Sequence, residues 1–337
     1  MSNQPVHHHH HRSFFWPVIL LGVGVIWLLT NLNIIPSDNL WILLRLWPVL
    51  IIVAGLDVLF SRRLPAVGAG FALLVIAGVV LILLQGDRLK LEGKPEAQTE
   101  TFIVDIGNTT AVNFDLALST QDTVVTALPT TGSLVEAQVG HYGRVEFTVT
   151  GSEHKWIRLE QRGVLPFMPW ILPGWGDLDL NWEVALTPEV PFNLSVDAST
   201  GRSELDLQGL QISRFEFDGG TGSSIINLAG SQEGYEAHID AGTGSLEITF
   251  PSDSNLTVNL RGSTGRIHLA VPEDQAVKIE VLRGGTGDLH LPDWITRVSG
   301  REGRDEGVYQ SVGFEDAAHQ LVIVVENIRT GNIFVDN

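Results

Sequence analysis

The chain has 337 residues, with 21 Lys and Arg against 39 Asp and Glu, and it contains no Cys. The net charge of −18 excludes a nucleic-acid-binding protein that depends on phosphate contacts, because such a protein needs a basic face. The absence of Cys excludes disulfide scaffolds, thiolate zinc sites and cysteine nucleophiles. Residues 1–85 hold only four basic and two acidic groups, whereas the rest holds 17 and 37. This uneven distribution predicts two parts that lie in different solvents.

Three long apolar stretches predict three transmembrane helices, at residues 13–35, 39–60 and 66–85. The first stretch has no charge and, at about 1.5 Å per residue, reaches roughly 34 Å, enough for the hydrocarbon core of a bilayer. A buried soluble bundle is the first alternative, and it is disfavoured because core helices keep a polar face. A signal peptide is the second alternative. It is disfavoured because the first stretch lacks a small-residue cleavage site and because two more apolar stretches follow it.

Basic residues in the short loops predict the orientation of these spans. Arg62 and Arg63 lie in the loop 61–65, Arg12 directly precedes the first span, and the loop between the first two spans has no basic residue. We therefore expect a multi-pass protein of the cell membrane with a cytoplasmic N-terminus. The chain after residue 86 is expected to be extracytoplasmic.

Few polar groups accompany these spans. Residues 1–12 form the predicted cytoplasmic tail, in which His7–His11 is either a metal-binding tract, a purification tag or a native disordered segment. Arg45 and Asp57 are the charges within a span, and they fit either an ion relay or side chains that reach the nearer interface. We favour the interfacial interpretation, because twelve residues separate the two charges along one helix.

The first two spans repeat one pattern. Residues 14–21 (FFWPVILL) align with residues 45–52 (RLWPVLII) at an offset of 31, and Gly24 then falls on Gly55. Trp at the interface and Pro in the first turn both suit the start of a membrane helix. On these residues, the segment 12–85 resembles the LiaI/LiaF-type transmembrane region of bacterial envelope-stress proteins.

The pattern changes beyond the third span. Residues 86–100 are predicted to be a polar linker. Alternation of apolar and polar residues then begins, for example in Val145–Val149 and Leu178–Trp182, and a period of two is typical of strands. We expect residues 101–190 to form the N-terminal all-β part of an outer domain.

Residues 191–337 contain a repeat built on Thr-Gly pairs. Successive Thr residues are 21, 22, 21, 22 and finally 44 residues apart, and 44 is twice 22. Apolar residues at even offsets share one face, so each repeat predicts two short strands and two turns. Stacked repeats form a β-solenoid, and the alternative is a meander of hairpins with the same strands. The expected structural turn residues are Gly201, Gly222, Gly244, Gly265, Gly287 and Gly331.

The Thr-Gly turns make residues 97–337 similar to the toast-rack domain family, which is found behind LiaF-like membrane regions and in bacterial adhesin candidates. The expected fold is thus three transmembrane helices followed by an extracytoplasmic, Gly-rich, β-solenoid-like domain. The resemblance implies a non-enzymatic accessory protein of the envelope-stress response that modulates a membrane histidine kinase through its helices. The alternative is a cell-surface adhesin or a structural envelope protein.

No catalytic pattern accompanies these repeats: there is no HExxH, Gly-x-Ser-x-Gly or P-loop sequence. Asp197, Asp218 and Asp240 precede three Thr-Gly turns, where they suggest either calcium or ordinary turn capping, and capping is favoured because the calcium nonapeptide is not met. Alternation places three histidines toward solvent: His238, His268 and His290. We predict no enzyme activity, no cofactor and no metal site.

Residues 164–176 are apolar, aromatic and rich in Pro, which prevents a long helix or strand. The segment either folds over the open end of the β-stack or forms an exposed patch for a partner or the membrane interface. In the second case Phe167, Trp170 and Trp175 are the candidate contact residues. The expected partners are the lipid bilayer, a membrane histidine kinase and cell-envelope components, and no nucleic acid.

Overall fold

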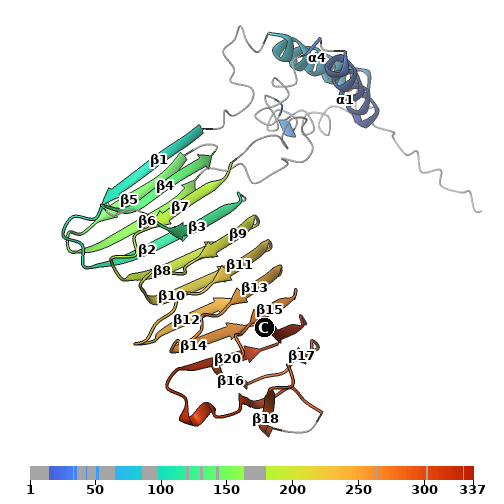
Figure 1. The fold of residues 1–337 in the computed structure, drawn as a ribbon. Coiled ribbons are helices and arrows are strands. Elements are labelled where there is room, and N and C mark those ends of the chain that lie inside the picture. Colours follow the sequence, from blue (N-terminus) through green and yellow to red (C-terminus); the bar gives the residue numbers. More distant parts are fainter. Residues whose placement is uncertain are drawn as a thin grey trace, which may run out of the picture. The chain divides into compact units, whose positions relative to one another are not determined.

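The structure of the chain is a computed structural model. The structure describes residues 15–32, 34–35, 43, 51–52, 65–85, 98–118, 121–129, 132–141, 144–162, 180–262, 264–300, 303–328 and 330–337. The chain divides into two units. The described α-helices belong to the first, and the described strands belong to the second, which begins at Ala97 (Figure 1).

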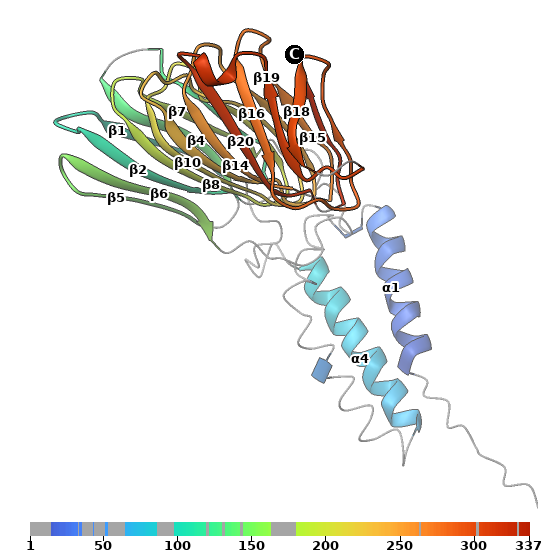
Figure 2. The ribbon, with the colours of Figure 1, turned by 90° about the horizontal axis from the view of Figure 1, so that it is seen from below.

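Two apolar helices are described along most of their length in the first unit, α1 (Phe15–Asn31) and α4 (Pro65–Leu84). They pack closely because Gly22 has no side chain: a Cβ there would lie 2.6 Å from Cδ1 of Ile76. Ile35 and Leu83 are buried where the two segments meet. Figure 2 shows the two helices side by side.

The two described helices correspond to the first and third of the three predicted membrane spans, and the second span is mostly outside the described residues. They fall within the spans predicted at 13–35 and 66–85, apart from Pro65 at the start of α4. The second predicted span, 39–60, lies outside the described residues except for Leu43, Ile51 and Ile52. Among the residues that are described, no helix combines the length and apolarity needed to cross a membrane. The three-span arrangement therefore remains a prediction.

The second unit consists of two stacked sheets, which we call sheets A and B. In spatial order, sheet A contains β1 (Gln98–Asp105), β4 (Ser133–His141), β7 (Trp182–Leu186), β3 (Thr123–Ala127), β9 (Arg202–Asp206), β11 (Ser223–Asn227), β13 (Ser245–Thr249), β15 (Ile267–Ala270), β21 (Ile333–Asp336) and β17 (Leu289–His290). Sheet B contains β5 (Arg144–Thr150), β6 (His154–Arg162), β2 (Ala111–Ala117), β8 (Phe192–Ala198), β10 (Ile212–Gly219), β12 (Tyr235–Asp240), β14 (Leu256–Arg261), β20 (Gln320–Asn327), β16 (Ala276–Val281), β19 (Gly307–Ser311) and β18 (Ile295–Gly300). A short 3-10 helix, η3 (Phe314–Asp316), precedes β20.

The Thr-Gly repeats form a solenoid. Each repeat is one coil, with a strand in sheet B followed by a strand in sheet A, and equivalent strands of neighbouring coils pair in parallel. Phe217, for example, pairs with Val196 on one side and Ile239 on the other. Parallel pairing across about 21 residues excludes the hairpin meander, in which consecutive strands would pair antiparallel.

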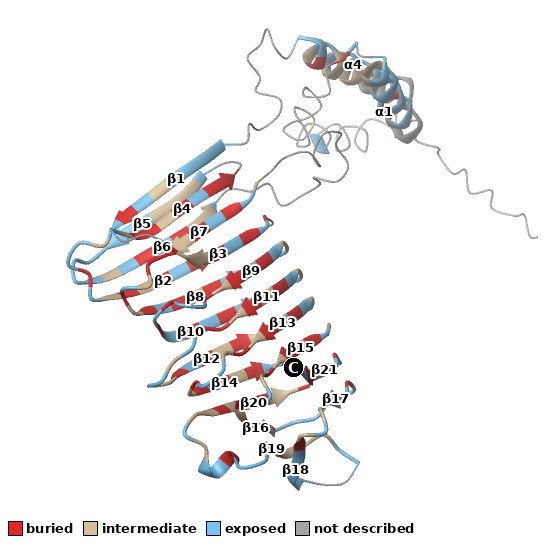
Figure 3. Ribbon diagram, in the orientation of Figure 1, coloured by how far each residue is buried: buried red, intermediate tan, exposed pale blue. Residues whose placement is uncertain are grey.

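Alternate residues of every coil face a continuous core between the sheets. Figure 3 shows buried and exposed positions alternating along the strands. Phe114, Leu194, Phe215 and Val258 occupy equivalent core positions in their coils, and all are at least 98% buried. One coil could not bury these residues by itself, so the stacking of neighbouring coils supplies the stability.

The solenoid begins before the Thr-Gly repeats. The coils β2–β3 and β6–β7 pair in parallel with each other, and β2–β3 also pairs with β8–β9. The predicted segments 101–190 and 191–337 are therefore parts of one stack. In addition, β1 starts at Gln98, three residues inside the predicted linker 86–100.

The last coil is inserted rather than added at the end. Strands β20 and β21 lie between the coils β14–β15 and β16–β17, which precede them in the sequence. The doubled interval of 44 residues before Gly331 is thus not explained by an additional coil between β16–β17 and β20–β21. It contains the hairpin β18–β19, which pairs antiparallel with β16 and closes that end of sheet B.

Candidate functional site

The Thr-Gly glycines form a column in which successive coils touch. A Cβ on Gly222, Gly244 or Gly265 would lie 1.7, 1.4 or 1.7 Å from the carbonyl oxygen of the glycine one coil earlier. A Cβ on Gly287 would lie 2.0 Å from the carbonyl oxygen of Gly331, which belongs to the inserted coil, and one on Gly201 would lie 2.2 Å from the carbonyl oxygen of Gln121. The φ angles of these five glycines lie outside the left-handed region. Glycine is therefore required at these positions because the backbones of neighbouring coils lie so close together, not because of a special backbone conformation.

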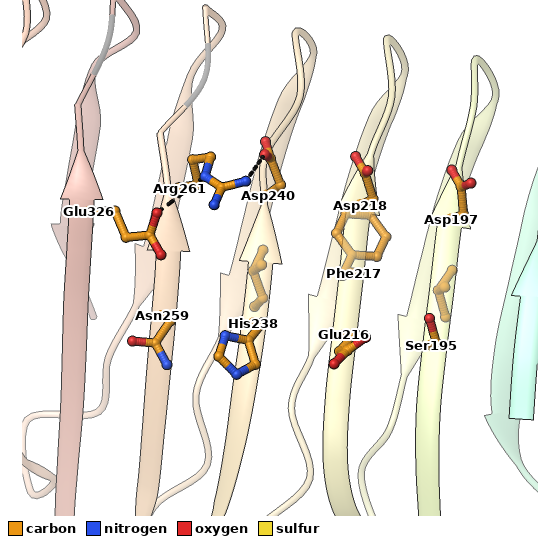
Figure 4. A pocket seen from close by; sticks show the side chains of 12 residues that line it. Ser195, Asp197, Glu216, Phe217, Asp218, His238, Asp240, Asn259, Arg261 and Glu326 are labelled. Atoms are coloured by element: carbon orange, nitrogen blue, oxygen red, sulfur yellow. Dashed lines mark hydrogen bonds and ion pairs between the residues drawn. The ribbon is translucent and has the colours of Figure 1, made fainter. Parts of the chain in front are cut away.

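Beside this column, acidic residues form a row on the outer face of sheet B, which we call the acidic row. Asp197, Asp218, Asp240 and Arg261 pair in register at the ends of β8, β10, β12 and β14. Parallel neighbours are about 4.8 Å apart, so consecutive side chains face the same water-filled space. Figure 4 shows the three Asp side chains at the same height on adjacent strands.

Arg261 closes one end of the acidic row. Its Nη1 lies 3.2 Å from Oδ2 of Asp240, and its Nε lies 3.2 Å from Oε2 of Glu326 on the inserted coil. The hydrogen bond to Asp240, followed by that to Glu326, raises the pKa of Arg261. Asp240 also accepts a hydrogen bond of 3.1 Å from the backbone N–H of Gly242, so this carboxylate caps its turn as predicted.

Asp218 is the member of the acidic row whose charged form is least favoured. Its pKa is raised, mainly because partial burial disfavours the charged form, and further by the negative charges of Asp240 and Asp197. Arg261 opposes this shift, but it lies two strands away in the register.

Replacing Asp218 with Asn is expected to stabilise the β unit slightly near pH 7. A carboxylate with a raised folded-state pKa disfavours the folded protein above that pKa, and this penalty disappears as the pH falls below the unfolded-state pKa of about 4. Because the side chain is exposed, we expect a gain below about 1 kcal/mol. Denaturant midpoints at pH 7 and pH 3.5 measure the change.

Glu247→Gln is the matched control for this substitution. Glu247 lies on the outer face of sheet A, where its register neighbours are Ile225 and His268 rather than carboxylates. An Asp218→Asn gain that persists at pH 3.5, or an equal gain in Glu247→Gln, would contradict charge repulsion within the acidic row.

The acidic row lines an open groove of about 430 Å³. Its polar lining is Ser195, Asp197, Glu216, Asp218, His238, Asp240, Asn259, Arg261 and Glu326 (Figure 4). Such a surface attracts cations electrostatically. Among the described residues, no group of three or more His, Cys, Asp or Glu side chains is arranged to hold a metal ion.

The predicted outward histidines lie on the two outer faces. His238 Nε2 is 3.2 Å from Oε1 of Glu236, and His268 Nε2 is 2.7 Å from Oδ2 of Asp336. His290 stacks on the ring of Phe334 at a centroid distance of 4.5 Å. The outward placement is thus confirmed, and each imidazole has a neighbour within its own sheet.

The candidate contact residues Phe167, Trp170 and Trp175 lie outside the described residues, within 163–179. Their role as a partner or membrane contact therefore stays a prediction.

Comparison with known families decides what the two units are. Residues 94–249 match the N-terminal domain of toast_rack, DUF2154, and residues 14–59 match the LiaI-LiaF-like transmembrane region. The chain thus joins a segment similar to LiaI/LiaF-like transmembrane regions to a segment similar to the N-terminal domain of toast-rack proteins. The first region is of a kind that anchors a chain in a membrane, and the resemblances inferred from the Trp-Pro and Thr-Gly patterns are confirmed.

Two solved structures have a low overall similarity to this chain. A candidate cell adhesion protein from Clostridium sporogenes is 15% identical, with a TM-score of 0.46, covering 71% of this chain and 99% of its own. A candidate adhesin from Bacteroides fragilis is 10% identical, with a TM-score of 0.28, covering 72% of this chain and 97% of its own. No curated protein matches the chain.

Proposed function

We propose that this LiaI/LiaF-like toast-rack protein is a non-enzymatic accessory protein of the envelope-stress response. In this proposal it is a multi-pass membrane protein that holds its β unit outside the cell and modulates a membrane histidine kinase. The observation that carries the proposal is the union of the two matched regions in one chain, at residues 14–59 and 94–249.

The orientation proposed from the basic loop residues constrains the route of a signal. Only the tail 1–12 and the loop 61–65 would lie in the cytoplasm, so a signal would pass through the helices rather than through a cytosolic domain. Three helix glycines support this route. Among the described residues, no atom lies within 4 Å of a Cβ added to Gly24, Gly70 or Gly78, and small residues allow close approach of a neighbouring membrane helix.

Replacing Gly78 with Leu is expected to reduce the amount of histidine kinase that is crosslinked to this protein in intact membranes by about fivefold or more. The bulky side chain would fill the open position on α4 and keep a second helix away. Pull-down after crosslinking, with mass spectrometry of the captured proteins, provides the measurement.

Leu81→Ile on the same helix is the matched control, because it keeps the volume of an exposed apolar residue. Absence of any histidine kinase from the crosslinked material of the unaltered protein would overturn the proposed function. Equal capture by Gly78→Leu would remove α4 from the contact.

The proposed sidedness has its own test. Protease added to intact cells should remove the β unit from the anchored chain. Protection in intact cells, with digestion after lysis, would place the β unit on the cytoplasmic side and end the sensing proposal.

The second candidate function is a cell-surface adhesin or a structural envelope protein. The open groove on sheet B favours it, because a rigid stack with a charged face can bind a ligand without passing a signal. Genes for a histidine kinase and a response regulator beside this gene would favour the first function over the second. In either case we propose that Trp170 and Trp175 contact a partner or the outer leaflet, and a blue shift of Trp fluorescence on lipid addition, lost in the double Ala variant, would support the lipid contact.

A further inference from the structure

Both sheets end in an open edge at the same end of the stack. Among the described strands, β1 is the last of sheet A and pairs with β4 alone, and β5 is the last of sheet B and pairs with β6 alone. The two edges face each other across the core, since the rings of Phe102 on β1 and Phe147 on β5 stack at a centroid distance of 4.6 Å. We call this surface the N-terminal edge.

The N-terminal edge has the features of a strand-pairing surface. β1 has eight residues and β5 has seven, and neither contains Pro. The register of β1 is regular up to its last residue, and that of β5 is regular throughout. Long regular edge strands expose a row of backbone N–H and C=O groups that a further strand can satisfy.

The side chains at this edge are incompletely covered. On the outer face of β1, Ile103 is 60% exposed. Phe102, Val145 and Phe147 pack against the core but are only partly buried, in contrast to the fully buried residues of the inner coils. Another layer of strands would complete the burial of this end.

The opposite end of the stack is protected against pairing. There, β17 has only two residues and Pro292 follows it after one residue, so it offers few backbone groups. β18 carries a register shift between Arg297 and Ser299, and bulges of this kind keep a further strand from adding.

We propose that a second copy of this chain occupies the N-terminal edge. A two-fold axis perpendicular to the sheets turns each edge strand onto an antiparallel copy of itself, so β1 would pair with β1 and β5 with β5 of the partner at once. The two solenoids would then share continuous sheets and one core.

The sequence of β5 is compatible with this self-pairing. With β5 centred on Phe147, Glu146 opposes Thr148 of the other copy and Arg144 opposes Thr150, so no like charges meet. Because the opposite end is protected, the contact closes as a dimer and does not propagate as a filament.

The experiment uses the full chain in its native membrane and exploits the absence of Cys. Thr101→Cys on β1 and Thr148→Cys on β5 place single thiols on exposed positions of the N-terminal edge, and Val298→Cys places one on β18, at a residue that is 60% exposed. After treatment with a short bis-maleimide, we expect a crosslinked dimer from both N-terminal-edge variants at five times the Val298→Cys yield or more.

A second substitution tests whether strand pairing causes the crosslink. Ile103→Lys adds a charge to the exposed face of β1 and should lower the Thr148→Cys dimer yield at least fivefold, whereas Val298→Lys should leave it unchanged. Equal yields from all three Cys variants, or no effect of Ile103→Lys, would overturn the proposal. Absence of a crosslinked dimer from both N-terminal-edge variants would also overturn it.

Discussion

Replacing Gly244 with Ala is expected to destabilise the β unit by about 3 kcal/mol or more. An added Cβ would lie 1.4 Å from the carbonyl oxygen of Gly222 and 2.6 Å from its carbonyl carbon. Both contacts are with backbone, so two coils must separate, and overpacking with backbone displacement lies at the upper end of measured costs. Because neighbouring coils share paired strands on both sheets, the separation would weaken the pairing of β11 with β13 as well. Denaturant unfolding of the β unit, followed by Trp fluorescence, measures the loss.

Gly284→Ala is the matched control. A Cβ on Gly284 would lie 3.7 Å from Cγ and Oε1 of Glu306, which is ordinary contact, and the φ of Gly284 is outside the left-handed region. We expect a change within about 0.5 kcal/mol there. Equal unfolding midpoints for the Gly244 and Gly284 variants would mean that the coils do not touch at the Thr-Gly column.

The strands and their inward faces were predictable from the sequence because they depend on local alternation. The even offsets from each Thr-Gly pair placed residues such as Ile226, Ile248 and Leu269 on one face, and all three are fully buried. The parallel pairing was one of two predicted alternatives, since a 21-residue period fixes which strands are equivalent but not which strands hydrogen-bond.

The order of the coils was not predictable, because it depends on contacts between distant residues. The coils β2–β3 and β6–β7 carry no Thr-Gly pair, so the repeat pattern could not register them. Likewise, the doubled interval before Gly331 is consistent with a missing coil or with an inserted hairpin. The register of Leu260 with Val325, 65 residues away, decides for insertion.

The same limit applies to the groove. The sequence placed Asp197, Asp218 and Asp240 before equivalent turns, and the capping role of Asp240 followed from that position. The contribution of Glu326 could not be foreseen, because its ion pair with Arg261 exists only where the inserted coil lies beside β14. The distance along the sequence between Arg261 and Glu326 therefore gives no indication that the two residues belong to one groove.

Truncation after Asp316 is expected to unfold the C-terminal end of the stack, although it removes only the last strands of the sequence. The deleted coil, β20–β21, buries Leu321, Ile323, Val325, Ile333 and Val335 between its neighbours. At about 1.5–3 kcal/mol for each buried side chain, the loss is comparable with the whole stability of a domain. Both β14 and β16 would then face an empty position, so their amide hydrogen exchange should approach that of an unfolded chain while β8 and β10 stay protected.

The hairpin β18–β19 provides the decisive comparison, because it has a similar length but lies at the end of sheet B. Ile295 and Ser311 are register partners, so a short Gly-Ser linker can join the chain where the hairpin is removed. Among the described strands the hairpin pairs with β16 alone, and the structure predicts that its deletion leaves β14 and β20 protected from exchange. If the coils instead stacked in sequence order, β20–β21 would be the terminal layer, and truncation would be the milder of the two deletions. Protection of β14 in the truncated chain would therefore refute the inserted coil, and with it the assignment of Glu326 to the acidic row.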